Sequence, residues 1–265
     1  MISLPRFSIF RGTFAYSWEA RRAVSASCPL ACGRDAEVDM KSDLRDFRLH
    51  AAKCSGGTSR GEIKQLVLRI MEAYTVTGKI LDFGAGTGEL IKILTENSEL
   101  ELSAVDILDR PIDLPIGVTW HQQDLNEELS NLRGPFDAVI CSEVIEHLEN
   151  PRAVFRNIAA VLKPGGKLIL TMPNQENIRS FLTLMFRGHF ASFMGPEYPA
   201  HITALLRMDL LRICRETGFT DPVCYYYAEY GWMPITKMTW QQFSFNLLKG
   251  RLFSDAVGTI VQKLP

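Results

Sequence analysis

The sequence lacks an apolar run of the ~18 residues that a transmembrane helix needs. It also lacks an excess of either charge, since the formal net charge is −1 over 265 residues. Nothing in this balance predicts a general electrostatic grip on nucleic acid, so no nucleic-acid partner is expected. Internal repeats and low-complexity tracts are absent as well. These absences favour one folded domain with additions, long enough to bury a full core.

Cysteine is scarce, and the six cysteines are scattered: Cys28, Cys32, Cys54, Cys141, Cys214 and Cys224. Cys28 and Cys32 have C-x-x-x-C spacing, but no third cysteine follows at the C-x-x-C spacing that one class of iron–sulfur site requires. No zinc-type pairing of cysteine and histidine is present in the sequence either. We therefore expect reduced structural thiols, a cytoplasmic protein and no bound metal.

The first 40 residues differ in composition from the rest. Up to Arg34 they contain five arginines and a single acidic residue, Glu19, with no sustained period. Transit peptides are rich in Arg and Ser and poor in acids, so residues 1–40 are compatible with a presequence for an organelle. A disordered leader, or sequence upstream of a true start at Met40, explains the same composition and is the favoured interpretation. The folded domain is then expected to occupy residues 41–265.

From about residue 60 onward, helix and strand signals alternate regularly. The expected elements are, in order, a helix over 63–71, a strand over 78–83, a helix over 87–96, strands over 100–106, 118–121 and 136–141, a helix over 151–162, a strand over 167–172, a helix over 207–217, a strand over 223–229, a helical stretch over 236–248 and a last strand over 256–262. Strands separated by helices predict a doubly wound α/β sheet. Ligand sites in such sheets lie at the carboxyl ends of the strands.

The stretch Asp-Phe-Gly-Ala-Gly-Thr-Gly-Glu, residues 82–89, is the most informative in the chain. Its three glycines, Gly84, Gly86 and Gly88, let the backbone fold over a ligand and present N–H groups at a helix N-terminus. A dinucleotide fingerprint needs its third glycine where Glu89 stands, and a P-loop needs lysine there. What remains is the pattern Asp/Glu-x-Gly-x-Gly-x-Gly.

This pattern resembles the first motif of class I S-adenosylmethionine (SAM)-dependent methyltransferases. Four later segments fall where that family has further motifs: Ser103–Asp106, Asp124–Asn126, Phe136–Leu148 with its Glu-His-Leu end, and Leu162–Leu168. The resemblance covers roughly residues 60–265 and is strongest to the small-molecule methyltransferases typified by those of ubiquinone biosynthesis. It implies SAM as cofactor and a Rossmann-like seven-stranded sheet, mostly parallel with an antiparallel last strand.

The resemblance also implies which residues bind SAM. These are Asp82, Gly84, Ala85, Gly86, Gly88, Asp106, Ile107, Asp124, Leu125, Cys141, Ser142 and Glu143. A carboxylate at Asp106 can accept hydrogen bonds from both ribose hydroxyls, the alternative being a surface Asp at a strand end. In the family the carboxylate at Asp124 accepts from the adenine amino group, although Asp is also a favoured helix N-cap. Backbone around 141–143 is implied to contact the methionine part of SAM.

Two histidines are candidate proton acceptors. His147 ends the fourth-strand motif, and an ordinary pKa of ~6.5 would let it take a proton from a substrate hydroxyl. A histidine that only orients the loop is the alternative, and we favour it. His201 stands where similar methyltransferases often carry a histidine, and its alternatives are an acceptor contact or a cap.

Residues 173–206 are the least generic part of the domain. Their middle is apolar and aromatic, with Phe181, Leu182, Leu184, Met185, Phe186, Phe190, Phe193 and Met194. An insertion of this kind beside an active site would make a lid or an acceptor pocket. The alternatives are a packed insertion helix and a patch over 181–195 that contacts a membrane surface weakly.

Together the motifs predict transfer of a methyl group from SAM to a small-molecule acceptor, with oxygen favoured as the acceptor atom. Such a displacement depends on alignment, and holding the reacting atoms ~3–3.5 Å apart contributes ~7–11 kcal/mol. An acceptor that is already ionised needs no base. The main alternative is a catalytically silent SAM-binding or adaptor protein on the same fold. An RNA methyltransferase is disfavoured by the near-neutral charge, and oligomeric state is not indicated by the sequence.

Overall fold

The computed structural model describes residues 40–129, 132 and 134–265. The expectation of a leader or presequence over residues 1–40, and the spacing of Cys28 and Cys32, fall almost wholly outside the described residues. Everything below concerns the unit Met40–Pro265.

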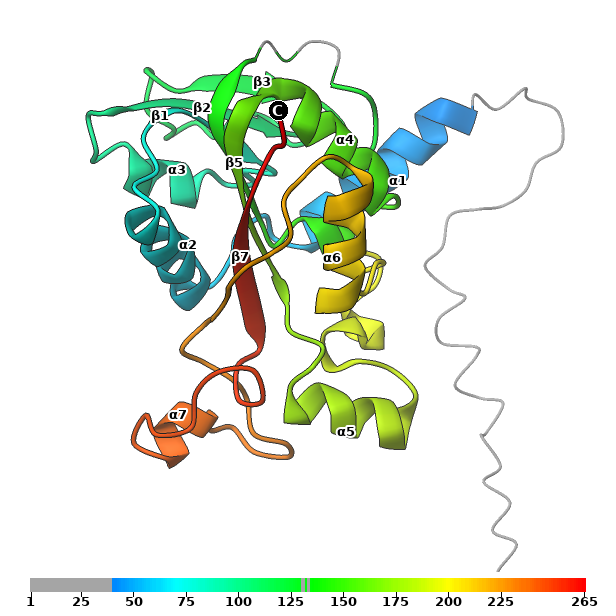
Figure 1. The fold of residues 1–265 in the computed structure, drawn as a ribbon. Helices are drawn as coiled ribbons and strands as arrows, with labels where there is room; N and C mark the ends of the chain where they lie inside the picture. Colours follow the sequence, from blue (N-terminus) through cyan, green and yellow to red (C-terminus); the bar gives the residue numbers. More distant parts are fainter. Residues whose placement is uncertain (1–39, 130–131, 133) are drawn as a thin grey trace, which may run out of the picture. The chain divides into compact units, whose positions relative to one another are not determined.

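Seven strands form one sheet in the order β3-β2-β1-β4-β5-β7-β6 (Figure 1). The strands are β1 Gly78–Phe83, β2 Leu100–Asp106, β3 Thr119–Gln122, β4 Phe136–Ser142, β5 Leu162–Pro173, β6 Tyr225–Tyr227 and β7 Ala256–Gln262. Neighbouring strands from β3 to β5 are all parallel, whereas β7 runs antiparallel to both β5 and β6. The predicted sheet, mostly parallel with an antiparallel last strand, is confirmed.

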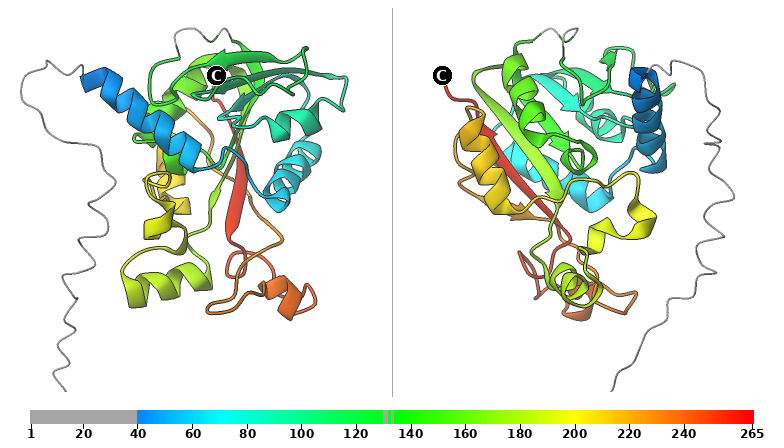
Figure 2. Two further views of the ribbon diagram at one scale, coloured as in Figure 1. Left: turned by 180° about the vertical axis from the view of Figure 1, so that it is seen from behind. Right: turned by 90° about the vertical axis from the view of Figure 1, so that its right-hand side faces the viewer.

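Helices cover both faces of this sheet, as the alternating pattern predicts (Figures 1 and 2). The helices are α1 Met40–Cys54, α2 Gly61–Ala73, α3 Glu89–Leu94, α4 Pro151–Val161, α5 Ile178–Arg187, α6 Arg207–Glu216 and α7 Trp240–Phe243, with 3-10 turns η2 Ile145–His147, η3 Ala191–Phe193 and η4 Gly195–Glu197. Apolar residues of α2 and α3 pack in one buried cluster, and those of α4 and α6 pack in the other. The two clusters lie on opposite faces because neighbouring strand residues point to opposite sides.

Three elements differ most from the sequence-based expectations, and β6 covers only Tyr225–Tyr227 of the strand predicted over 223–229. β5 begins at Leu162 rather than at 167, because Gly165 and Gly166 stay paired with Lys263 instead of forming a free turn; the N–H of Gly165 donates to the Lys263 carbonyl at 3.0 Å. The predicted helical stretch over 236–248 is wrong for most of its length, since only Trp240–Phe243 is helical. The helix α1 had no predicted counterpart.

None of the helices in the described part of the chain is both long and apolar enough to cross a membrane.

Candidate cofactor and acceptor site

A cavity of about 570 Å³ opens at the carboxyl ends of β1, β2 and β4. Its volume lies within the range of small-molecule sites, roughly 300–1,000 Å³. Of the twelve predicted SAM-binding residues, ten line it: Asp82, Gly84, Ala85, Gly86, Asp106, Ile107, Asp124, Leu125, Ser142 and Glu143. The other two do not. Gly88 precedes α3 with a φ of 73°, and the side chain of Cys141 is fully buried in the core.

The glycine turn after β1 has no room for side chains. Gly84 has a φ of 84°, and a Cβ there would lie 2.4 Å from Cγ2 of Val144. Gly86 has a φ of 54°, and its Cβ would lie 2.0 Å from the carbonyl oxygen of Gly57. Positive φ and the close neighbours together require glycine at both positions. The turn, which we call the glycine cradle, therefore lines the cavity with backbone that packs closely on Val144 and Gly57.

Asp106 fastens this cradle to the end of β2. Its Oδ2 accepts the N–H of Gly86 at 2.7 Å, and its Oδ1 accepts the N–H of Leu108 at 2.9 Å. Burial raises the pKa of Asp106 and these backbone hydrogen bonds oppose the rise. Burial, together with the nearby Asp106, also raises the pKa of Asp82 to about 7. The cavity floor therefore has two buried carboxyl groups that a cationic ligand would stabilise in their ionised form.

Asp124 lines the cavity as predicted, but its carboxylate already has a cation beside it. Nη1 of Arg48, from α1, lies 2.9 Å from Oδ2 of Asp124 and 2.8 Å from Oε1 of Glu127. The other edge of the guanidinium binds both carboxylate oxygens of Glu149 at 2.9 Å. Oδ1 of Asp124 accepts the backbone N–H of Asn126 at 2.9 Å. Arg48 thus ties α1 to the loops after β3 and β4, a contact that no sequence pattern indicated.

Two glutamates that follow β4 have buried carboxylate oxygens without donors. Both carboxylate oxygens of Glu146 and Oε1 of Glu143 have no hydrogen-bond partner among the described residues. Burial raises the pKa of Glu146 to about 8, and burial together with Glu146 raises that of Glu143 well above its usual range. Glu143 also has a φ of 56°, in the left-handed region that non-glycine residues rarely adopt. Strain of this kind gathers at functional sites, and here it faces the cavity.

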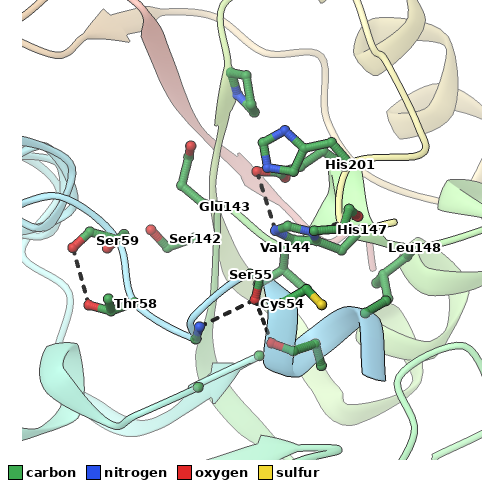
Figure 3. A pocket seen from close by; sticks show the side chains of 18 of the residues that line it. Cys54, Ser55, Thr58, Ser59, Ser142, Glu143, Val144, His147, Leu148 and His201 are labelled. Atoms are coloured by element: carbon green, nitrogen blue, oxygen red, sulfur yellow. Dashed lines mark hydrogen bonds and ion pairs between the residues drawn. The ribbon is translucent and has the colours of Figure 1, made fainter. Parts of the chain in front are cut away.

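His147 and His201 lie against each other in the cavity wall (Figure 3). Their ring centroids are 4.8 Å apart, in an edge-to-face arrangement. Nδ1 of His147 lies 2.8 Å from the Ala200 carbonyl oxygen, and Nδ1 of His201 lies 2.6 Å from the Ser192 carbonyl oxygen. A carbonyl oxygen can only accept, so each Nδ1 carries a proton and each Nε2 keeps its lone pair. Burial lowers the pKa of both rings, which keeps them neutral at pH 7.

The same histidines form a candidate cation site with Glu146. Among the described residues, Glu146, His147 and His201 are the group of three whose ligand atoms could hold a metal ion, and these atoms lie within 4.8 Å of one another. Carbonyl oxygens that fix the Nδ1 protons are typical partners of metal-binding histidines. That the protein binds no metal stays a prediction. The sequence did not reveal this group because His147 and His201 are far apart in the chain and form no recognisable motif.

The segment 173–206 borders the cavity, as expected of a lid or acceptor pocket. Backbone N–H groups of Ile202 and Thr203 both donate to the Glu146 carbonyl oxygen at 2.9 Å, which fixes His201 beside the end of β4. Movement of this segment as a lid stays a prediction.

Several residues of the cavity wall went unrecognised in the sequence. The guanidinium of Arg60 lies over the rings of Tyr230 and Trp232, 4.9 and 5.6 Å from their centroids. Nη1 of Arg179 lies 3.4 Å from Oδ2 of Asp255. All five line the cavity. They come from elements far apart in the chain, so no local pattern could have grouped them.

The free energy of unfolding of the wild type should fall as the pH rises, and Glu146→Gln should make this fall smaller. With its pKa raised from 4.5 to about 8, Glu146 keeps a proton in the folded protein that the unfolded chain has released. The free energy of unfolding therefore falls between pH 4.5 and about 8, by up to ~1.4 kcal/mol per pH unit for this group. Urea unfolding of the cofactor-free protein at several pH values measures the slope.

The matched control is Glu128→Gln, which changes an exposed carboxylate and should keep the wild-type slope. An identical slope in wild type and Glu146→Gln would show that Glu146 ionises normally.

Comparison with known proteins identifies the family of this chain. A family model described as a methyltransferase domain matches residues 57–222. The chain is 26% identical over 179 residues to a ubiquinone biosynthesis O-methyltransferase of Coxiella burnetii (strain RSA 331 / Henzerling II), over 64% of this chain and 70% of that protein. It is 30% identical over 145 residues to the enzyme of that name from Xanthomonas axonopodis pv. citri (strain 306), over 49% of this chain and 60% of that protein.

Solved structures share the fold at lower identity. The Burkholderia thailandensis 1,6-didemethyltoxoflavin-N1-methyltransferase, solved with S-adenosylhomocysteine, has a TM-score of 0.57 and 14% identity, over 90% of this chain and 95% of that one. A SAM-dependent methyltransferase from Archaeoglobus fulgidus has a TM-score of 0.55 and 20% identity, over 84% of this chain and 99% of that one. At such identities the likeness shows the fold alone.

Proposed function

This chain belongs to the methyltransferase-domain family and is a SAM-dependent methyltransferase, and from that premise we propose that it methylates a hydroxyl oxygen of a small molecule. One observation carries the proposal. His147, a neutral imidazole whose Nε2 carries no proton, lines the same cavity as ten of the predicted SAM-binding residues. The O-methyltransferases among the relatives also support oxygen as the acceptor atom.

The residues present fit SAM. Gly84 and Gly86 line the cavity with backbone atoms, and the carboxylates of Asp106, at the end of β2, and Asp124, after β3, would accept hydrogen bonds from the ribose and the adenine. The buried carboxyl of Asp82, raised in pKa to about 7, favours a cationic ligand nearby. When bound, SAM supplies an electrophilic methyl group on a sulfonium whose departing thioether is neutral.

The remaining task for the protein is to hold the acceptor in line and remove its proton. His147 would accept the proton on Nε2 while its Nδ1–H stays bound to the Ala200 carbonyl oxygen. His201, packed edge-to-face against it, restrains the ring. Tyr230 and Trp232 line the same cavity, where the Arg60 guanidinium lies over both rings.

The proposal is tested by following the labelled methyl group of SAM onto paired acceptors, one with a phenolic hydroxyl and one with an aromatic amine in its place. We expect transfer to the hydroxyl member. His147→Gln should lower kcat ~10²–10⁴-fold for an acceptor that enters with its proton, and far less for a phenol acidic enough to enter ionised. A larger loss of kcat with the protonated phenol than with the ionised phenol would show that His147 removes the proton, because loss of packing would affect both phenols.

His50→Gln is the control, since His50 is exposed on α1. An equal loss of kcat with the protonated and the ionised phenol would mean that His147 only positions the acceptor. Binding of SAM without transfer to any acceptor would favour the catalytically silent alternative.

A further inference from the structure

The helix α5 is amphipathic with its apolar side in solvent. Four large apolar side chains are between 42% and 76% exposed: Phe181, Leu184, Met185 and Phe186. The buried residue of the helix is instead Ser180, whose hydroxyl donates to Oε1 of Gln175 and accepts the N–H of Ala191, both at 3.0 Å. A surface helix normally turns its apolar stripe inward. The inverted arrangement leaves an apolar surface that the described chain does not cover.

A second exposed apolar group lies in the segment 232–253, which contains α7. Its members are Ile235, Met238, Phe243, Phe245, Leu247 and Leu252, all at least 46% exposed. The N–H of Ile178, at the start of α5, donates to the Leu252 carbonyl oxygen at 3.0 Å, which joins the two segments. In all three views of Figures 1 and 2, α5 and α7 lie at the same end of the sheet. We call these two groups together the apolar end face.

The charged residues within the two segments that carry the apolar end face are all basic. Neither 177–196 nor 230–254 contains an aspartate or a glutamate, although the whole chain has 30 of them. The two segments carry five cations: Arg179, Arg187, Lys237, Lys249 and Arg251. Two of these have acidic partners, Arg179 with Asp255 and Lys249 with Glu229. The other three form no ion pair with any described carboxylate. The face is thus basic in a protein whose net charge is −1.

We propose that the apolar end face docks the protein on the surface of a bilayer that contains anionic lipids. Exposed Phe and Leu side chains enter the acyl boundary while Arg and Lys side chains meet the headgroups. A pairing of two copies through this face would instead bring two sets of cations together without carboxylates to neutralise them. Large apolar side chains exposed together at one end of a protein mark an interaction site. This inference is independent of the proposed acceptor.

Vesicle flotation of the purified full-length protein tests the docking. Wild type should float with vesicles of phosphatidylcholine and phosphatidylglycerol, much less with phosphatidylcholine alone, and less as salt is raised. The double variant Phe181→Ser with Phe186→Ser should lower the bound fraction at least roughly fivefold. Lys237→Glu with Arg251→Glu should lower it on the anionic vesicles in particular.

The matched control is Ile112→Ser with Ile116→Ser, because these isoleucines are 104% and 100% exposed in the loop between β2 and β3. The control should float like wild type, and melting curves should match for all variants. Failure of wild type to float, or an equal loss in the control, would overturn the proposal. So would a lipid-free dimer in sedimentation velocity that Phe181→Ser with Phe186→Ser abolishes, since the face would then bind a second copy.

Discussion

Asp106→Ala should weaken SAM binding by roughly a hundredfold or more. Its carboxylate is expected to accept two ribose hydroxyls, and hydrogen bonds to a charged group contribute ~1.5–3 kcal/mol each. The structure adds a second reason, because Asp106 also holds the N–H of Gly86 at 2.7 Å and so shapes the glycine cradle. Calorimetric titration of wild type and variant with SAM measures the effect.

Two variants make this result interpretable. Asp106→Asn keeps an acceptor oxygen and loses the charge, so its affinity should lie between those of wild type and Asp106→Ala. Asp109→Ala removes an exposed carboxylate from the same loop and should bind SAM normally. Because Asp106→Ala leaves the N–H groups of Gly86 and Leu108 without their acceptor, its melting temperature should fall, and the titrations are made well below it. Unchanged affinity in Asp106→Ala would place the cofactor elsewhere.

Arg48→Ala should release α1 from the cavity and weaken SAM binding at least roughly tenfold, or ~1.4 kcal/mol. Arg48 is the shared partner of Asp124, Glu127 and Glu149, and its side chain is only 13% exposed. Truncating one partner of a buried ion pair leaves an uncompensated charge, here on Asp124, whose side chain is 8% exposed. Release of α1 from the cavity would let water hydrate the unpaired Asp124 carboxylate, so we expect α1 to detach.

The two effects can be read separately. Limited trypsin digestion should cut within 40–54 faster in Arg48→Ala than in wild type, and calorimetry gives the change in affinity. Arg48→Lys keeps the charge but cannot bind carboxylates in the bidentate manner, so it should be intermediate. Arg45→Ala removes an exposed arginine from the same helix and is the control. Tighter SAM binding in Arg48→Ala would mean instead that Arg48 competes with the cofactor for Asp124.

The elements that sequence reasoning placed well are those that local patterns specify. β1 and β2 coincide with the predicted ranges because buried parallel strands read as short apolar runs ended by glycine or a polar residue. The start of α4 at Pro151 was equally readable, since proline suits the first helical turn and Asn150 caps it. The helical prediction over 236–248 failed because a short helix needs tertiary packing that its local pattern does not supply. Phe243, Phe245 and Leu247 remain in solvent, so no packing holds a longer helix there.

By itself the sequence determined where most strands lie along the chain, the glycine turn and the carboxylates at the strand ends, because backbone conformation and side-chain alternation follow from neighbouring residues. Only the tertiary structure decided that Arg48 closes on Asp124, that His147 meets His201, and that α5 turns its apolar side outward. Each of these joins segments that are distant in the chain or depends on which face the core leaves free. Such contacts arise from packing, and no spacing in the sequence records them.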